Sequence, residues 1–401
     1  MGHVTARIGP MPVRRAGWTP HHIPDGQALG LSAAITDPAG PGQHAEHLAA
    51  FVGVPVCFCA GGEGDVAEGD AVVVEDFVDP DVAGEPANET GIGNMGFHMA
   101  GNIRRAIPSS TTLVINDMNH AACKRFLTEF AHLGPIQIAA TAKEAATLGK
   151  TVLVMVPTGT HSRAVFLDSP DSIIHAPTDE HRLILECSTI DMKTCTEIGQ
   201  KIMAAGVGRY IDAPVSGGVV GAAKAKLSFM AGCPSPDATE SIESLESRAH
   251  RIMSMMGDPT KIFYTDKLGT GLAAKIANNY IACCTTLATA EAMAIGVRSG
   301  IDPAALFRII KASSGSSWHL DFNPCMPGMV PTAPSSNGFA PSFKPFLAVK
   351  DLSLGIEAGA DTGVEPRCAE AACRTFREAA ENPEYKDLDF TSVWLLINRE
   401  K

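Results

Sequence analysis

The chain has 401 residues, of which 45% are hydrophobic and 19% are charged, a composition typical of a globular enzyme with room for two domains. The eleven cysteines lack paired metal-ligand spacing, so we expect reduced thiols and no metal site. The formal net charge is −12 and no uninterrupted apolar run reaches the length of a membrane span. We expect neither a nucleic-acid nor a membrane partner.

The first 87 residues differ in composition from the rest of the chain. They contain three basic residues against twelve acidic ones and are rich in Gly and Pro. Stretches such as PAGPGQH follow neither a helical nor a strand period. We therefore predict that residues 1–87 form a low-complexity segment, either disordered or misannotated. Residues 1–24 contain arginines and no acidic residue, a weak sign of a transit peptide.

The dinucleotide fingerprint G-x-G-x-x-G follows this segment. Gly91, Gly93 and Gly96 match its glycines, with Asn94 and Met95 between them, and FHMAGNIRRAI then continues as a helix. In this fingerprint the glycines permit a tight turn and bring a pyrophosphate close to the N-terminus of the helix. These five residues are therefore candidates for cofactor binding.

The fingerprint requires a strand immediately before its first glycine. Residues 83–90 (AGEPANET) are polar and contain a proline, so they predict no strand. We therefore expect the first strand to be missing and NAD to bind weakly. The best substitute is residues 71–78 (AVVVEDFV), whose β-branched run favours a strand but lies far upstream of Gly91.

Residues 111–117 (TTLVIND) form an apolar, β-rich run that ends in Asp117, 24 residues beyond Gly93. An acidic residue at this distance binds the hydroxyls of the adenosine ribose. No arginine follows at once to accept a 2′-phosphate. The pattern therefore favours NAD over NADP.

Strands and helices alternate from this point. The predicted strands are 136–140, 151–157, 182–189 and 210–215, and the predicted helices are 120–134, 142–149 and 194–206. Such alternation indicates a doubly wound, mainly parallel Rossmann-type sheet, which we assign to residues 88–266. Ligands bind beyond the carboxyl ends of such strands, which places Val156–Pro157, Ser188–Thr189 and Ser216–Gly218 at one edge.

Residues 269–297 predict one long, nearly all-apolar helix. Within it Lys275 and Asn279 lie four residues apart and so project from the same face. A lysine in this setting either reaches out to water or stays buried at a cost to its charged form. Asn is also a poor residue for a helix interior. These costs favour a functional pair over a lysine that merely reaches solvent.

Only helices are predicted beyond residue 267. They cover residues 302–314, 343–363 and 367–381, and a Pro-, Gly- and Ser-rich loop between residues 318 and 343 is long enough to cover a site. We assign residues 267–401 to an all-helical C-terminal domain joined to the first domain by the long helix.

Several motifs together resemble the 3-hydroxyisobutyrate dehydrogenases, a branch of the β-hydroxyacid dehydrogenases, over roughly residues 91–401. They are GIGNMGFHMAGN, DAPVSGGVVGAAKAKLSFMAG, GTGLAAKIANN, FKPFLAVKDL and SSGSSWHLDFNPCMPGMVP. The sequence departs from this pattern at Ala225, where a glycine is usual, and in the strand expected before the first glycine.

The resemblance implies roles for individual residues. Lys275 matches the catalytic lysine and Asn279 its partner. Ser216, Gly217 and Gly218 match the residues that bind the substrate carboxylate. The residues that match positions bordering NAD are Val156, Pro157, Thr189 and Lys350.

The resemblance also implies the reaction, which is the NAD-dependent oxidation of 3-hydroxyisobutyrate to methylmalonate semialdehyde in valine catabolism. It implies a homodimer or homotetramer, located in mitochondria in eukaryotes. The chemistry suits the residues, because burial beside a second cation such as Lys350 pulls a lysine pKa from about 10.4 toward about 7–8. A general acid–base role for Lys275 follows.

Two alternatives stay open. The first is an NAD(P)-dependent enzyme for another small β-hydroxyacid or semialdehyde, because backbone amides at Ser216–Gly218 recognise any carboxylate. The second is a catalytically impaired paralogue, which the missing strand favours and the intact pair of Lys275 and Asn279 disfavours.

Overall fold

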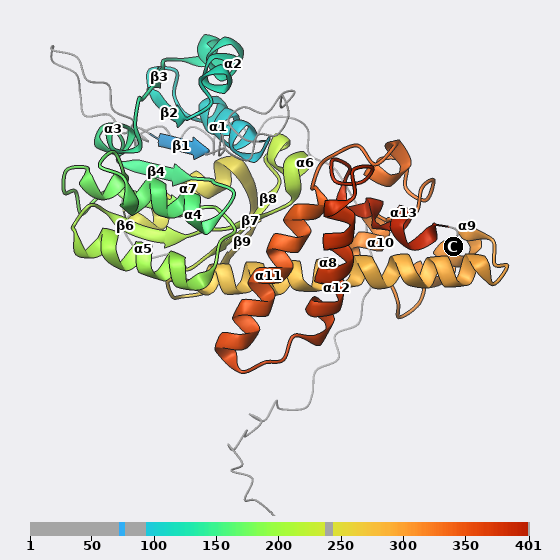
Figure 1. Ribbon diagram of the computed structural model, residues 1–401. Helices are drawn as coiled ribbons and strands as arrows, with labels where there is room; N and C mark the ends of the chain where they lie inside the picture. The colour runs from blue at the N-terminus through green and yellow to red at the C-terminus, as the bar shows by residue number, and fades with distance from the viewer. Residues whose placement is uncertain (1–71, 77–93, 237–243, 400–401) are drawn as a thin grey trace, which may run out of the picture. The chain divides into compact units, whose positions relative to one another are not determined.

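The computed structural model describes residues 72–76, 94–236 and 244–399, all within one unit of the chain, Pro55–Lys401. An α/β part is followed along the chain by a helical part (Figure 1). The strands are β1 (Val72–Asp76), β2 (Leu113–Asp117), β3 (Ile136–Ile138), β4 (Thr151–Val154), β5 (Leu183–Glu186), β6 (Arg209–Asp212), β7 (Val215–Ser216), β8 (Leu227–Ala231) and β9 (Gly257–Tyr264).

The helices of the α/β part alternate with these strands, and those of the helical part follow one another. They are α1 (Asn94–Ala106), α2 (His120–Phe130), α3 (Ala142–Leu148), α4 (Gly159–Arg163), α5 (Met192–Ala204), α6 (Gly218–Ala223), α7 (Leu245–Met256), α8 (Thr270–Arg298), α9 (Pro303–Lys311), α10 (Trp318–Phe322), α11 (Pro345–Thr362), α12 (Arg367–Glu381) and α13 (Val393–Asn398).

The main sheet is parallel and has the strand order β3-β2-β1-β4-β5-β6. This is the strand order of a doubly wound dinucleotide-binding sheet. The order runs outward from β1 in one direction through β2 to β3, and in the other direction from β4 to β6. The predicted fold class, a Rossmann-type domain followed by a helical domain, is therefore confirmed. The carboxyl ends of β1, β2, β4, β5 and β6 all meet at one edge, where such folds bind ligands.

The expectation of a missing first strand needs correction. β1, Val72–Asp76, lies in the centre of the sheet and pairs in parallel with β2 and β4, for example Val72 with Leu113 and with Thr151. β1 lies within residues 71–78, the segment predicted above as the best substitute for the first strand. Its β-branched residues suit a strand that pairs with a neighbour on each side. Residues 77–93, which join β1 to α1 and include Gly91 and Gly93, lie outside the described residues, as does the segment 1–71.

A second, smaller sheet was not predicted. Its order is β7-β8-β9, with β7 antiparallel and β9 parallel to β8. β7 has only two residues and β9 begins with the polar sequence GDPTK, so neither carries the apolar alternation of a strand. Ala225, just before β8, has a positive φ of 50°, which explains why a glycine suits this position better.

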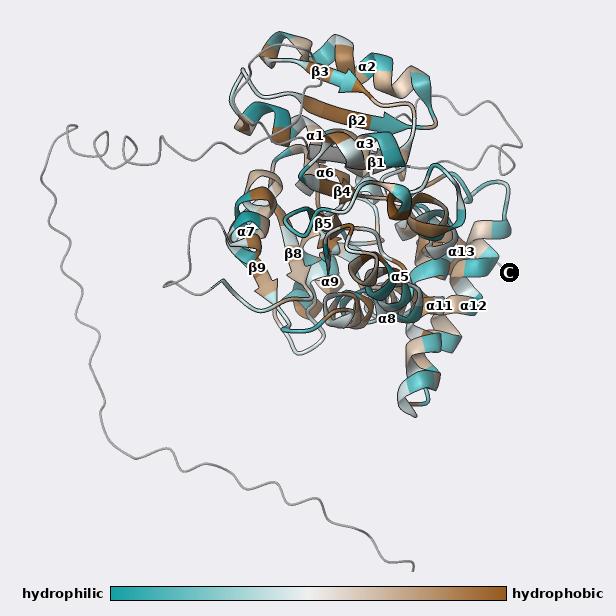
Figure 2. Ribbon diagram, turned by 90° about the vertical axis from the view of Figure 1, so that its left-hand side faces the viewer, coloured by the Kyte–Doolittle hydropathy of each residue, from teal (hydrophilic) through white to brown (hydrophobic). Residues whose placement is uncertain are grey.

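The two parts of the chain have separate cores. Apolar residues of the main sheet are fully buried between helices, as in β2 and β5, whereas helices such as α2 and α12 carry both hydrophobic and hydrophilic patches (Figure 2). In the helical part, α8 packs against α11 and α12. The core of this part includes Leu287, Phe376 and Trp394. The loop predicted between residues 318 and 343 contains the short helix α10.

The long helix α8 begins at the carboxylate of Asp212, the last residue of β6. The backbone N–H groups of Gly269 and Leu272 donate to its two oxygens at 2.7 and 2.9 Å. A Cβ atom on Gly232 or Gly271 would collide with this carboxylate, so both glycines let the strand and the helix approach closely. Asp212 thus caps the helix that carries Lys275.

By length and composition alone, α8 is also apolar enough to cross a membrane, with a mean hydropathy of 1.4, contrary to our expectation from the sequence. Lys275, Asn278, Asn279 and Glu291 interrupt the apolar sequence of α8, yet an 18-residue window of the helix still passes this test. A third of that window is buried within the protein, and Lys275 and Asn279 are both buried.

We predict that replacing Asp212 by alanine destabilises the protein. Two buried N–H groups at the start of α8 lose their acceptors, which costs about 2–4 kcal/mol of the free energy of unfolding. Chemical denaturation of the purified variant measures this loss. Asp212→Asn keeps one acceptor oxygen and should lose less; equal stability of Asp212→Ala and the unmodified protein would contradict the capping role.

Candidate active site

Lys275 and Asn279 lie on the same face of α8, as predicted, and both are buried, at 7% and 9% exposure. The Asn279 amide is held from two sides. Its Nδ2 donates to Oδ2 of Asp351 at 2.5 Å, and its Oδ1 accepts from Nδ2 of Asn278 at 3.0 Å. Asn279 therefore connects the face of α8 to helix α11.

Asp351 is a site residue that the sequence analysis missed. It is 3% exposed, lies next to Lys350 on α11, and its Oδ1 lies 3.4 Å from Nζ of Lys350. The geometry makes this an ion pair and not a hydrogen bond, so Oδ1 receives no hydrogen bond from the described residues. An acidic residue beside a lysine in the apolar sequence FKPFLAVKDL was the signal that could have identified it.

The surroundings of Lys275 set its charge state. Burial lowers its pKa below the ordinary value, Asp351 opposes this by attraction, and the positive charge of Lys350 lowers the pKa further. The predicted direction, a lysine pKa lowered by burial and a second cation, is the one found. A lowered pKa makes the neutral amine, the form that accepts a proton, more populated at a given pH than it is in a solvated lysine.

Lys350 also connects α11 to the carboxyl ends of β4 and β5. Its Nζ donates to the backbone oxygen of Thr189 at 2.8 Å and to that of Pro157 at 3.2 Å. These strand ends also contact each other, because the N–H of Val156 donates to Oγ of Ser188 at 2.7 Å. The structure therefore brings together Lys275, Asn279, Lys350 and the strand-end loops.

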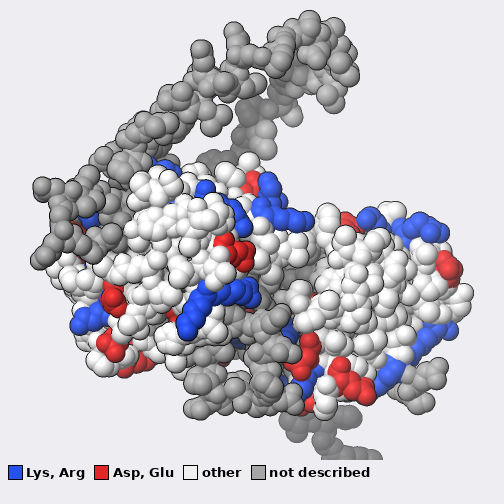
Figure 3. Space-filling view, turned by 90° about the horizontal axis from the view of Figure 1, so that it is seen from above, with Lys and Arg blue, Asp and Glu red and all other residues white. Residues whose placement is uncertain are grey.

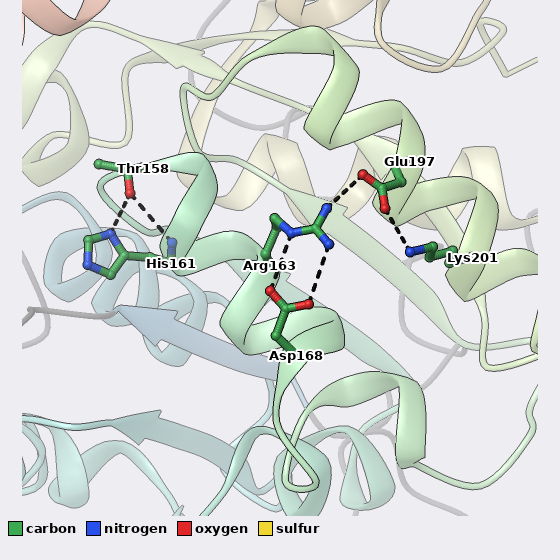
Figure 4. A network of polar contacts seen from close by, with 6 residues as sticks. All are labelled: Thr158, His161, Arg163, Asp168, Glu197 and Lys201. Carbon is green, nitrogen blue, oxygen red and sulfur yellow. Dashed lines mark hydrogen bonds and ion pairs between the residues drawn. The ribbon is translucent and has the colours of Figure 1, made fainter.

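A polar network follows the loop at the end of β4 (Figure 4). Oγ1 of Thr158 contacts Nδ1 of His161 at 2.7 Å and caps α4. Arg163 then pairs with Asp168 and with Glu197 of α5, and Glu197 accepts from Lys201. Exposed ion pairs contribute little singly, but this connected set ties α4 to α5 beside the loop.

Ser216, Gly217 and Gly218 lie where β7 passes into α6. Gly217 and Gly218 have φ values of 136° and 61° and are exposed, a conformation that favours glycine. Ser216 pairs with Ser228 of β8, and α8 packs on β8 at its first turn through Gly271. No hydrogen bond within the described residues joins these three residues to Lys275.

Asp117 lies at the end of β2 and is 3% exposed. Its Oδ1 accepts from the N–H of Asn119 at 2.6 Å, whereas Oδ2 is buried and has no hydrogen-bond partner among the described residues. Burial raises the pKa of Asp117 to about 7, against the lowering effect of the Asn119 bond. A buried carboxylate oxygen without a partner fits the place of a ribose hydroxyl donor.

The first turn of α1 fits a pyrophosphate. α1 begins at Asn94 and has no acidic residue in its first turn, so no side chain of that turn competes with an anion for its N-terminal N–H groups. Met95 is half-buried and Gly96 is buried. The structure thus supports three of the five fingerprint residues as part of a helix N-terminus, and Gly91 and Gly93 lie outside the described range.

Two family profiles match the chain. One is described as the NAD binding domain of 6-phosphogluconate dehydrogenase and matches residues 89–292. The other is described as the NAD-binding region of NADP-dependent 3-hydroxyisobutyrate dehydrogenase and matches residues 269–397. Dinucleotide binding is therefore common to both, and they do not distinguish NAD from NADP.

Curated relatives and solved structures agree with these profiles. The chain is 34% identical to 3-hydroxyisobutyrate dehydrogenase of Pseudomonas aeruginosa, over 76% of this chain and 95% of that protein. It is 31% identical to the mitochondrial 3-hydroxyisobutyrate dehydrogenase of Rattus norvegicus, over 79% and 88%. The solved Mycobacterium tuberculosis 3-hydroxyisobutyrate dehydrogenase with L-serine has a TM-score of 0.68 at 29% identity, covering 82% of this chain and 99% of that one.

Proposed function

Because the chain belongs to the 3-hydroxyisobutyrate dehydrogenase family and is an NAD(P)-binding β-hydroxyacid dehydrogenase, we propose that it oxidises 3-hydroxyisobutyrate to methylmalonate semialdehyde with NAD. This reaction belongs to the breakdown of valine. The rat relative is named mitochondrial, and we propose the same location for this chain.

One observation carries the proposal. Lys275 is buried on α8, where Asn279 of the same face binds Asp351 of α11 and Lys350 pairs with Asp351; burial and the charge of Lys350 lower the pKa of Lys275. Oxidising a primary alcohol requires a base that removes the hydroxyl proton. Lys275 is the group whose environment suits this task, and an impaired paralogue would have no need to keep it buried.

When bound, NAD would accept the hydride that leaves the alcohol carbon. Lys275 takes the hydroxyl proton as the carbonyl forms, and returns it in the reverse direction. Asn279 and Asp351 hold the two helices together around it, and Lys350 keeps its positive charge close because the carbonyls of Pro157 and Thr189 anchor its amine.

We assign the substrate carboxylate to Ser216, Gly217 and Gly218. Positive φ values at Gly217 and Gly218 turn this segment into α6, and both glycines are exposed, so a small carboxylate can reach their backbone. We assign the pyrophosphate to the turn at Gly91–Gly96, the adenosine ribose to Asp117, and the nicotinamide side to Val156, Pro157, Thr189 and Lys350.

A second candidate substrate has its own support. The solved relative from Mycobacterium tuberculosis is described with L-serine, which is itself a small β-hydroxyacid. Contacts to a carboxylate at Ser216–Gly218 do not distinguish the two acids. Comparing kcat/KM for 3-hydroxyisobutyrate and L-serine decides between them.

We predict that Lys275→Ala abolishes turnover and leaves NAD binding largely intact. The amine acts on the reacting hydroxyl and not on the cofactor phosphates, so kcat should fall by about 10²–10⁴-fold. Steady-state rates and a fluorescence titration of NAD measure the two effects separately.

The exposed Lys267→Ala, just before α8, is the matched control and should keep full activity. Near-native turnover of Lys275→Ala would rule out its role as the general base.

The second prediction concerns Asp117 and the cofactor. Ribose hydroxyls donate hydrogen bonds to the ionised carboxylate of Asp117, and without cofactor Asp117 has a pKa of about 7. Below pH 7 most of the protein carries a protonated Asp117, which must lose its proton before NAD binds. The affinity for NAD should therefore fall by about tenfold from pH 8 to pH 6. NAD should also bind better than NADP, because the carboxylate repels a 2′-phosphate. Calorimetric titrations at the two pH values test both.

The variant Asp117→Asn should show no such pH dependence, and its affinities for NAD and NADP should differ less. The control Asp361→Asn, on the exposed part of α11, should change neither property. Equal use of NAD and NADP by the unmodified protein would count against the assignment.

We also propose that a second copy of the chain covers one face of α8. Ile281 and Ile295 are 62% and 67% exposed and lie close to four helical turns apart, on one face. Figure 3, seen from above the view of Figure 1, shows a wide uncharged area bordered by Lys, Arg, Asp and Glu, without placing Ile281 or Ile295 in it. The exposed Ala288 and Ala292 lie between them along the same face, and a continuous exposed apolar patch of this kind marks an interface.

The expected solution mass is that of a dimer or tetramer. Ile281→Asp should lower the solution mass toward that of a single chain, because burying the charged aspartate in the interface removes its hydration at a cost in free energy. Ile138→Asp on β3 should leave the mass unchanged. Light scattering after size exclusion measures the mass. A monomer for the unmodified protein, or its co-sedimentation with lipid vesicles, would overturn the proposal.

A further inference from the structure

Glu186 is a buried carboxyl group that the proposed mechanism does not use. It ends strand β5, beside the cofactor edge of the sheet, and has no exposed surface. Oε1 accepts from the N–H of Ser188 at 2.9 Å, and Oε2 accepts from Oγ of Ser162 in α4 at 2.5 Å. A group with this cost of burial fixes the backbone that follows the strand.

Ser188 passes this constraint to the neighbouring strand. Its N–H is held by Glu186, and its Oγ accepts from the N–H of Val156 at 2.7 Å. The turn after β5 and the turn after β4 are thus joined by one side chain. All four residues of this set, Val156, Ser162, Glu186 and Ser188, are buried.

The two carbonyls that anchor Lys350 come directly after these bonded residues. Pro157 follows Val156, and Thr189 follows Ser188. Lys350 donates to both, at 3.2 and 2.8 Å. A shift of either turn would therefore move an acceptor away from the lysine amine.

We propose that Glu186 and Ser188 are positioning residues that hold the carbonyls of Pro157 and Thr189 where they anchor Lys350. This inference rests on the proposed role of Lys275 as the general base. Lys350 then keeps its positive charge near Lys275, and the two buried side chains set the proton affinity of the base from a distance.

The consequence is a pH effect with a defined sign. Among the described residues, the charged or titratable groups that act on Lys275 are Asp351 and Lys350 of α11 and Cys283 of α8. Of these, Lys350 lowers the pKa of Lys275 and the other two raise it. Losing the anchor of Lys350 therefore raises the pKa of Lys275, and alcohol oxidation, which needs the neutral amine, shifts to higher pH.

The test compares two buried serines that both bond to Glu186. Ser188→Ala removes the acceptor for Val156, whereas Ser162→Ala removes only the bond toward α4. In the pH profile of kcat, Ser188→Ala should move the midpoint of the acidic limb upward by about one pH unit, and Ser162→Ala should leave it unchanged. A merely structural loss would lower kcat alike at every pH.

Glu186→Gln provides the conservative variant. Its amide oxygen still accepts from Ser188 and its NH₂ group can donate to Ser162, so the profile of the unmodified enzyme should be retained. Glu186→Ala should reproduce the shift of Ser188→Ala, and circular dichroism shows whether it folds.

An unmoved midpoint in Ser188→Ala, or an equal shift in Ser162→Ala, overturns the inference. The Lys275→Ala variant separates the two proposals. If it stays active, the general base is wrong; if it is inactive and Ser188→Ala is unshifted, only the positioning role fails.

Discussion

The carboxylate of Asp212 is the constraint on which the rest of the site depends. It lies at the end of β6 and binds the first free N–H groups of α8, so the sheet determines where the longest helix begins. Burial raises the pKa of Asp212, while the N–H groups that bind it lower the pKa. Since Lys275 comes just over one turn after Gly271, its position follows from this cap.

Burial has opposite effects on the charged groups around α8. Burial lowers the pKa of Lys275, the carboxylate of Asp351 raises it, and the positive charge of Lys350 lowers it further. Asp351 also binds Asn279, so one carboxylate both joins two helices and tunes the lysine. The surroundings of Lys275 are therefore made by α11 as much as by α8.

The cluster around Lys275 could be predicted in part from the sequence. Lys275 and Asn279 were singled out because polar residues in an apolar helix carry a cost, and Lys350 because its motif resembles that of the 3-hydroxyisobutyrate dehydrogenases. Asp351, Glu186 and Asp212 were missed, since an acid at the end of a strand or beside a lysine has no period that marks it. Their roles come from partners 24 to 72 residues away or in the next turn.

The first strand shows the same limit. Residues 71–78 had the β-branched composition of a strand, yet their distance from Gly91 argued against a place beside it. The sequence by itself determined the long helices and most strands of the main sheet, and which polar residues must find partners when buried, because these follow from local periodicity and the cost of desolvation. Only the tertiary structure decided that Val72–Asp76 lies between β2 and β4, and that Lys350 reaches the carbonyls of Pro157 and Thr189, because pairing and hydrogen bonding join segments that no local pattern connects.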